Sequence, residues 1–102
     1  MGLYRSTPDG RILMANPALL GMLGYSSFEK IDQRNLDENG FEPKKQRAIF
    51  KKRMKEEGQV IGLESVWERK DGNLLFVREN AKSIYDEEGN ILHYEGTVED
   101  IT

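Results

Sequence analysis

"LLFVRENAKSIYDEEGNILHYEGTVEDIT", residues 74–102, alternates inward and outward positions with a period of two on both sides of a turn. That period is typical of β-strands, because successive side chains of a strand point to opposite faces of the sheet. The turn is predicted at DEEGN, residues 86–90, since glycine and asparagine tolerate left-handed backbone. The expected inner face carries Leu75, Val77, Glu79, Ala81 and Ser83 on the first strand, and Leu92, Tyr94, Gly96 and Val98 on the second.

The same period extends to two other parts of the chain. Another strand is predicted from Val60 onward, and Asp71-Gly72 supplies the turn after it. Near the N-terminus, two short apolar runs flank Pro8-Asp9-Gly10, in which proline presets φ and glycine accepts positive φ. The inner face of the strand that begins at Val60 is expected to carry Ile61, Leu63, Ser65 and Trp67.

Three helices are predicted between the two strand regions. The first spans 17–23, with Asn16 as its cap and Gly24 after its last turn. Ser26 and Glu29 form a capping-box pattern that opens a second short helix. The third spans 43–57, ends at Gly58, and has an apolar side expected to contain Ile49, Phe50 and Met54. Strands, then helices, then strands indicate an α+β domain with an antiparallel sheet.

Composition limits the classes of function. The 102 residues are enough for one domain, and the absence of cysteine excludes disulfides, thiolate metal sites and a cysteine nucleophile. The sequence has one histidine and no clustered pair of carboxylates, so it offers no nucleophile–base set and we expect no enzymatic activity. No metal site is predicted. No apolar run is long enough to span a bilayer, so direct membrane insertion is not expected either.

Charge is concentrated in one predicted helix. The formal net charge is −3, yet residues 44–55 hold seven basic residues and no acidic one. A solvated helix face is the simpler interpretation, and nucleic acid is not an expected partner. Binding of an acidic partner or nucleic acid through 44–55 stays open as an alternative function.

Three stretches together resemble a PAS domain, the sensory-box module of bacterial signal-transduction proteins. They are GLYRSTPDGRILMANPALLGMLGYSS at the front, then ERKDGN, and finally YDEEGNILHYEGTVEDIT. The resemblance covers essentially residues 1–102, taken as a single sensory domain. It implies a five-stranded antiparallel sheet in the order 2-1-5-4-3, with three to four helices over one face that enclose a pocket.

The resemblance also implies a signalling context. In the family, the chain continues past the last strand into a helical linker and an effector, such as a histidine kinase or diguanylate cyclase. We therefore expect an input domain excised from a longer protein, with a C-terminal effector in the same chain. The expected location is cytoplasmic, although the parent could be membrane-anchored. The residues expected to transmit the signal are Asp100, Ile101 and Thr102.

A ligand pocket is expected on the inner face of the sheet. Glu79 is unusual there, because burying a carboxylate without a partner costs several kcal/mol or forces its protonation. It could recognise a polar or cationic ligand, or it could lie at the rim or pair with a basic residue of the long helix. The resemblance implies that the pocket positions are Trp67, Val77, Glu79, Ala81, Gly96 and Val98, and Ser65 is a further candidate near Glu79.

Cofactors of known PAS subclasses are not expected. Flavin photosensors of this fold use a cysteine near the second and third helices, where this chain has DQRNL, residues 32–36. Haem-binding members place a histidine on the long helix, and 43–57 contains none, while His93 is expected to face away from the pocket. A small-molecule ligand, of unknown identity, remains possible.

Two functions fit this resemblance. One is a ligand sensor; the other is a ligand-free module for dimerisation and relay. Dimerisation is expected through the outer sheet face, because an apolar surface of that size needs a cover. The residues expected on this homodimer face are Val60, Val66, Leu74, Phe76 and Ile84.

Overall fold

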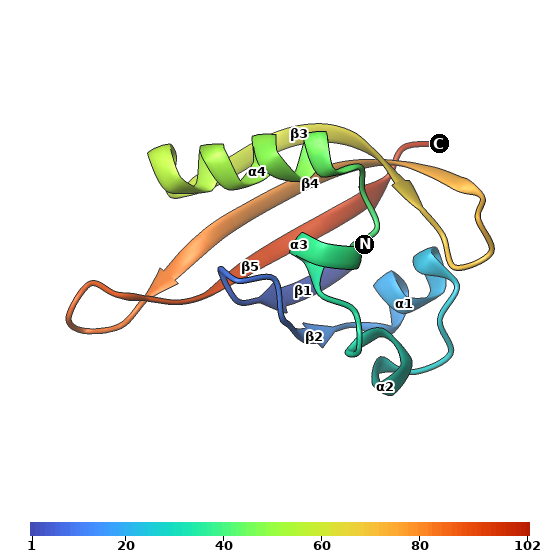
Figure 1. The fold of residues 1–102 in the computed structure, drawn as a ribbon, viewed down its shortest axis with the longest axis horizontal. Helices are drawn as coiled ribbons and strands as arrows, with labels where there is room; N and C mark the ends of the chain where they lie inside the picture. Colours follow the sequence, from blue (N-terminus) through green and yellow to red (C-terminus); the bar gives the residue numbers. More distant parts are fainter.

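A computed structural model describes all residues from 1 to 102 as an antiparallel sheet with four helices packed on it (Figure 1). The strand order is β2-β1-β5-β4-β3, so the predicted fold is confirmed. The elements are β1 (Gly2–Ser6), β2 (Ile12–Ala15), α1 (Pro17–Leu23), α2 (Phe28–Ile31), α3 (Leu36–Asn39), α4 (Lys44–Glu57), β3 (Gln59–Glu68), β4 (Leu74–Tyr85) and β5 (Ile91–Asp100).

The last strand lies at the centre of the sheet. On one side β5 pairs with β1, where Tyr4 is opposite Gly96. On its other side β5 pairs with β4, where Glu79 is opposite Val98. The two ends of the chain therefore meet in adjacent strands, and residues far apart in sequence share the inner face.

The cap of α1 is the one predicted from sequence. Asn16 Oδ1 accepts hydrogen bonds from the backbone N–H of Leu19, at 3.0 Å, and of Leu3, at 2.9 Å. Gly24 follows the helix in the left-handed conformation, with φ of 86°. Because Asn16 binds both the helix and β1, it fixes α1 against β1.

The two short helices differ from the prediction. The cap position of α2 is Ser27 rather than Ser26, and its side chain makes no capping hydrogen bond. We did not predict α3, which has only four residues and no apolar period. It forms because Asn35 Oδ1 accepts from the N–H groups of Asp37 and Glu38.

The inward side of α4 is also different from the prediction. Phe50 and Met54 are buried, but Ile49 is exposed and Arg47 is buried instead. Residues three and seven positions apart share a helix face, which groups Arg47 with Phe50 and Met54 and turns Ile49 away. A charged side chain thereby enters the interior beside the sheet.

A β-bulge changes the pattern of β3. Val60 is only 2% exposed, whereas Ile61 is 73% exposed, so the prediction of Val60 on the outer face and Ile61 on the inner face was wrong. The register with β4 shifts between Val60 and Leu63, and Gly62 adopts φ of 64° within that interval. The extra residue reverses the alternation, because two residues on β3 oppose one on its partner.

Leu92 was also predicted inward and is exposed. The register between β4 and β5 shifts at Ile84/Tyr85, close to the turn. In Figure 1 the β4–β5 hairpin projects beyond the helices, so no element covers the inner face at its tip. The predicted inner face of β4 is confirmed in full, since Leu75, Val77, Glu79, Ala81 and Ser83 are all buried.

Candidate functional site

A cavity of about 30 Å³ lies between the inner face of the sheet and the helices. Most of its lining is apolar, and it includes Phe41 and Trp67, whose ring centroids lie 6.3 Å apart. A volume of this size holds about one water-sized group. The polar residues that border it are Tyr4, Glu42, Arg47, Trp67 and Glu79.

Glu79 lies in the middle of β4 and is 2% exposed. The Tyr4 hydroxyl donates a hydrogen bond to Oε2 of Glu79, and Oε1 has no partner in the protein. Burial raises the pKa of Glu79 from 4.5 to about 8; the bond from Tyr4 and the charge of Arg47 oppose this rise, and the charge of Glu42 adds to it. Glu79 is therefore mostly protonated at neutral pH.

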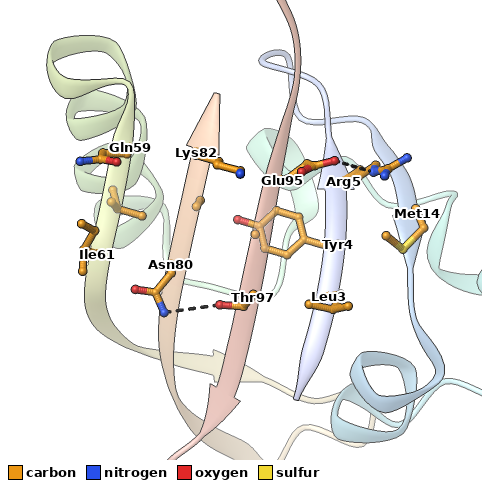
Figure 2. Close-up of a pocket in the computed structure, with 13 residues that line it drawn as sticks. Leu3, Tyr4, Arg5, Met14, Gln59, Ile61, Asn80, Lys82, Glu95 and Thr97 are labelled. Carbon is orange, nitrogen blue, oxygen red and sulfur yellow. Dashed lines mark hydrogen bonds and ion pairs between the residues drawn. The ribbon is translucent and has the colours of Figure 1, made fainter. Parts of the chain in front are cut away.

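Gly96 makes room for this hydrogen bond. A Cβ at position 96 would overlap the Tyr4 ring. Figure 2 shows the Tyr4 ring reaching from β1 across β5 toward β4. Glycine is needed at this position because the aromatic ring lies directly against the backbone of the central strand.

Arg47 approaches the cavity from α4. Its Nε lies 2.9 Å from Asp37 Oδ1, while Lys51 Nζ lies 2.7 Å from Asp37 Oδ2. Burial opposes ionisation of Asp37, but the hydrogen bonds from Lys51 and Arg47 outweigh it and lower the pKa. Asp37 is thus a fixed anion that holds the Arg47 guanidinium in place, at 4.8 Å above the Phe50 ring.

Glu42 completes the polar side of the cavity. Its Oε1 lies 3.9 Å from Arg47 Nη1, a longer separation than Arg47 has from Asp37. Burial raises the pKa of Glu42, while Arg47 and the indole N–H of Trp67 oppose the rise. The indole N–H is near the carboxylate but outside hydrogen-bonding geometry.

Four buried polar atoms around this cavity have no hydrogen-bond partner in the protein. Two are carboxyl oxygens, Glu42 Oε2 and Glu79 Oε1, and two are nitrogen donors, Arg47 Nη2 and Trp67 Nε1. Native proteins leave few buried polar groups unsatisfied, and each such group calls for an explanation. A cluster of four beside one cavity is a candidate binding site for a small polar ligand.

A family model described as PAS domain matches residues 1–102. The chain belongs to the PAS domain family. No curated protein matches it. Among solved structures, similarity extends over 99% of this chain, at 15–21% identity.

Three of these structures show how the PAS fold is shared. A light-oxygen-voltage domain studied with a flavin analogue is 21% identical, with a TM-score of 0.82 over 77% of its chain. The PAS domain of the fruit-fly ELK potassium channel is 15% identical, with a TM-score of 0.81 over 86% of its chain. A PAS domain from Colwellia psychrerythraea is 19% identical, with a TM-score of 0.84 over 86% of its chain.

The predicted pocket residues of this PAS domain separate into two groups. Trp67 and Glu79 border the cavity. The other candidates are buried on the inner face without bordering it. Without a ligand, Glu79 was expected either at the rim of the pocket or in an ion pair with a basic residue of the long helix. It is buried and forms no ion pair, so neither expectation is met. The candidates that do not border the cavity are Ser65, Val77, Ala81, Gly96 and Val98.

Sequence reasoning missed three residues of the site. Tyr4 belonged to a predicted strand, but nothing in the sequence related it to Glu79. Glu42 directly precedes the predicted long helix, and nothing in the sequence related it to the pocket. Arg47 was counted with the basic run, although its spacing from Phe50 and Met54 was an available signal that it faces inward.

The outer sheet face of the PAS domain carries a shallow groove of about 370 Å³ (Figure 2). Leu3 and Ile61 lie along it, and it also contains an ion pair of 2.9 Å between Arg5 and Glu95. Four predicted dimer-face residues lie on this side of the sheet, and the buried Val60 does not. Of the four, Val66 and Ile84 are half-buried, whereas Leu74 is 61% and Phe76 is 47% exposed.

The three predicted transmission residues bind to the start of β4. Ile101 donates its backbone N–H to the Phe76 carbonyl at 2.8 Å, and Phe76 donates its own N–H to Thr102 Oγ1 at 3.1 Å. Asp100 Oδ1 accepts from the Thr102 backbone N–H at 2.9 Å, and this bond lowers the pKa of Asp100. The segment after β5 is therefore held against β4.

Two further observations concern metals and membranes. No group of three or more potential metal-binding side chains lies close enough together to hold an ion. None of the four helices has the length and hydropathy required to cross a membrane.

Proposed function

We propose that this PAS domain is a signal-input module whose conformation depends on what occupies the cavity beside Glu79. The observation that carries the proposal is the cluster of four unpartnered polar atoms from Glu42, Arg47, Trp67 and Glu79. These residues come from the segment before α4, from α4 itself, and from two strands, so one small occupant would contact several elements at once.

A route from the cavity to the end of the domain supports a relay function. Glu79 is opposite Val98 in the sheet, and Val98 lies two residues before Asp100. The segment that follows is bonded to Phe76, three residues before Glu79 on the same strand. A ligand biases this exit only through its different affinity for two states, and coupling of about 1–3 kcal/mol is usual.

In the parent protein, we propose an effector after Thr102 that receives this signal, such as a histidine kinase or diguanylate cyclase. We further propose that the input is not flavin photochemistry. One structural neighbour is a light-oxygen-voltage domain, but this chain has no cysteine with which a flavin could form a covalent adduct. The cavity is also much smaller than the ~300–1,000 Å³ of usual ligand pockets.

A relay module that dimerises without a ligand is the second candidate. The exposed Leu74 and Phe76 on the outer sheet face favour it. The two candidate functions differ in one respect: only in the ligand sensor does the occupant of the cavity change the conformation of residues 100–102.

Backbone NMR spectra of a cavity variant test the proposal. Glu79→Gln preserves size and removes the ionisable group, and it should shift the amide signals of Asp100, Ile101 and Thr102. Glu56→Gln is the matched control, because Glu56 is exposed on α4. Shifts confined to the immediate neighbours of position 79 would contradict a sensory cavity and leave the ligand-free relay.

A further inference from the structure

Acidic residues outnumber basic residues around the cavity. Three acidic residues, Asp37, Glu42 and Glu79, are accompanied by two basic residues, Arg47 and Lys51. The short contacts of both bases go to Asp37, at 2.7 and 2.9 Å. Glu42 and Glu79, the two carboxyl groups that border the cavity, therefore have no close basic partner. The nearest is the guanidinium of Arg47, at 3.9 Å from Glu42.

The unpartnered oxygens show which carboxyl groups lack a hydrogen-bond donor. Glu42 Oε2 and Glu79 Oε1 are both buried and neither accepts a hydrogen bond within the protein. The side chain of Glu42 is 6% exposed and Glu79 is 2% exposed, so bulk water does not solvate them. Once Glu79 is ionised, these two desolvated oxygens form an acceptor set for a cation that carries N–H donors.

We infer that this cavity binds a small protonated amine, whose ammonium group donates hydrogen bonds to Glu42 and Glu79. The inference rests on the proposed sensory function and names its ligand class. The volume of about 30 Å³ accommodates an ammonium group with little or no organic substituent. The apolar lining from the sheet and helices excludes a larger hydrated cation, because such an ion would keep its water shell.

Binding of the cation exchanges it for a proton. Without such a cation, burial raises the pKa of Glu79 to about 8. An ammonium group beside Glu79 favours the carboxylate, so Glu79 releases its proton to solvent as the amine enters. The other ionisable groups that act on Glu79 are Tyr4 from β1, Glu42 before α4 and Arg47 from α4. The net charge of the cluster then changes little, and the amine competes with protons for the site.

A comparison of ammonium with potassium tests this inference directly. The two ions are similar in size, but only ammonium donates hydrogen bonds. We expect ammonium chloride to raise the Tm of the domain in a saturable manner, beyond the effect of potassium chloride at equal concentration. The difference should be larger at pH 8 than at pH 6, because fewer protons compete. Tetramethylammonium, which is larger and has no N–H group, should behave like potassium.

Variants locate the effect. Glu79→Gln and Glu42→Gln should each abolish the difference between ammonium and potassium, while the exposed control Glu56→Gln should keep it. Calorimetry of ammonium binding in two buffers of different ionisation enthalpy should show proton release at pH 7 in the unmodified domain. This readout does not depend on the folding of any variant.

Equal effects of ammonium and potassium would overturn the inference. They would indicate that the cluster binds water, which can donate two hydrogen bonds to the carboxyl groups and accept two from Arg47 and Trp67. The proposed sensory function would survive that result if Glu79→Gln still shifted the amides of residues 100–102. If those amides also stayed unchanged, both proposals would fail.

Discussion

The hydroxyl of Tyr4, on the first strand, donates a hydrogen bond to the carboxyl group of Glu79, which lies 75 positions later on the fourth strand. The bond crosses the central strand at Gly96, so it joins β1 and β4 over β5. Glu79 has no other hydrogen bond that could replace it, since its second oxygen accepts none.

Tyr4→Phe should destabilise the domain by about 1–2 kcal/mol, because it removes the only hydrogen bond of a buried carboxyl group. Urea unfolding measures the change, and Tyr85→Phe is the control because Tyr85 is exposed. Since the Tyr4 bond lowers the pKa of Glu79, the variant should also raise that pKa further. Equal stability of the two variants would contradict the role given to this bond.

Gly96→Ala should cost about 1–3 kcal/mol, because the added Cβ overlaps the Tyr4 ring and displaces it from Glu79. Gly21→Ala is the matched control: nothing lies near its Cβ on α1, so it should stabilise by about 0.5–1 kcal/mol. In a Tyr4→Ala background, Gly96→Ala should cost little. Additive effects of the two changes would show that the ring is not the obstacle.

Stability should fall as the pH rises from about 4.5 to about 8. Glu79 has a higher pKa in the folded state than in the unfolded chain, so between these values the folded state binds more protons. The stabilisation is complete below the unfolded pKa and disappears as the pH passes the folded one. Glu42, whose pKa is also raised, adds a change of the same sign.

Urea titrations at several pH values measure this slope. Glu79→Gln should flatten it, whereas Glu56→Gln should leave it unchanged. Asp37 acts in the opposite direction, because its lowered pKa means that its contribution disappears in acid, below about 3.8. A stability that rises steadily from pH 5 to pH 8 would rule out a buried, protonated Glu79.

The purified domain should be colourless. Covalent flavin attachment through cysteine is chemically impossible, α4 has no histidine for haem, and the cavity is far smaller than a flavin ring system. Absorption spectroscopy of protein purified from cells grown with riboflavin and haem precursors measures this. A stoichiometric visible band would refute the prediction, since non-covalent flavin binding needs no cysteine.

The domain should form a homodimer through the outer sheet face. Leu74 and Phe76 are 61% and 47% exposed there, and burying them against a second copy removes apolar surface from water. Phe76→Glu should dissociate the dimer in sedimentation experiments, whereas Ile49→Glu, on the exposed side of α4, should not. A monomer at high micromolar concentration in the unmodified protein would count against this interface.

Most of the fold could be predicted from local features. Turn residues such as Asp9-Gly10 and Asp71-Gly72, the cap at Asn16 and the period of two in the strands act over a few positions, so the sequence shows them directly. The strand order came from the family resemblance and not from periodicity. Gly62 is an exception, because the alternation read from sequence assumed a regular strand and the bulge reversed it.

The sequence by itself therefore determined the strands, three of the four helices, their turns and the inward position of Glu79. Only the tertiary structure decided which side chains surround Glu79. Tyr4 reaches it because β1 and β4 flank the same central strand, and Arg47 enters because helix packing turns one basic residue inward. No local pattern encodes these contacts, since their partners lie dozens of positions apart and meet only when the sheet closes and α4 packs against it.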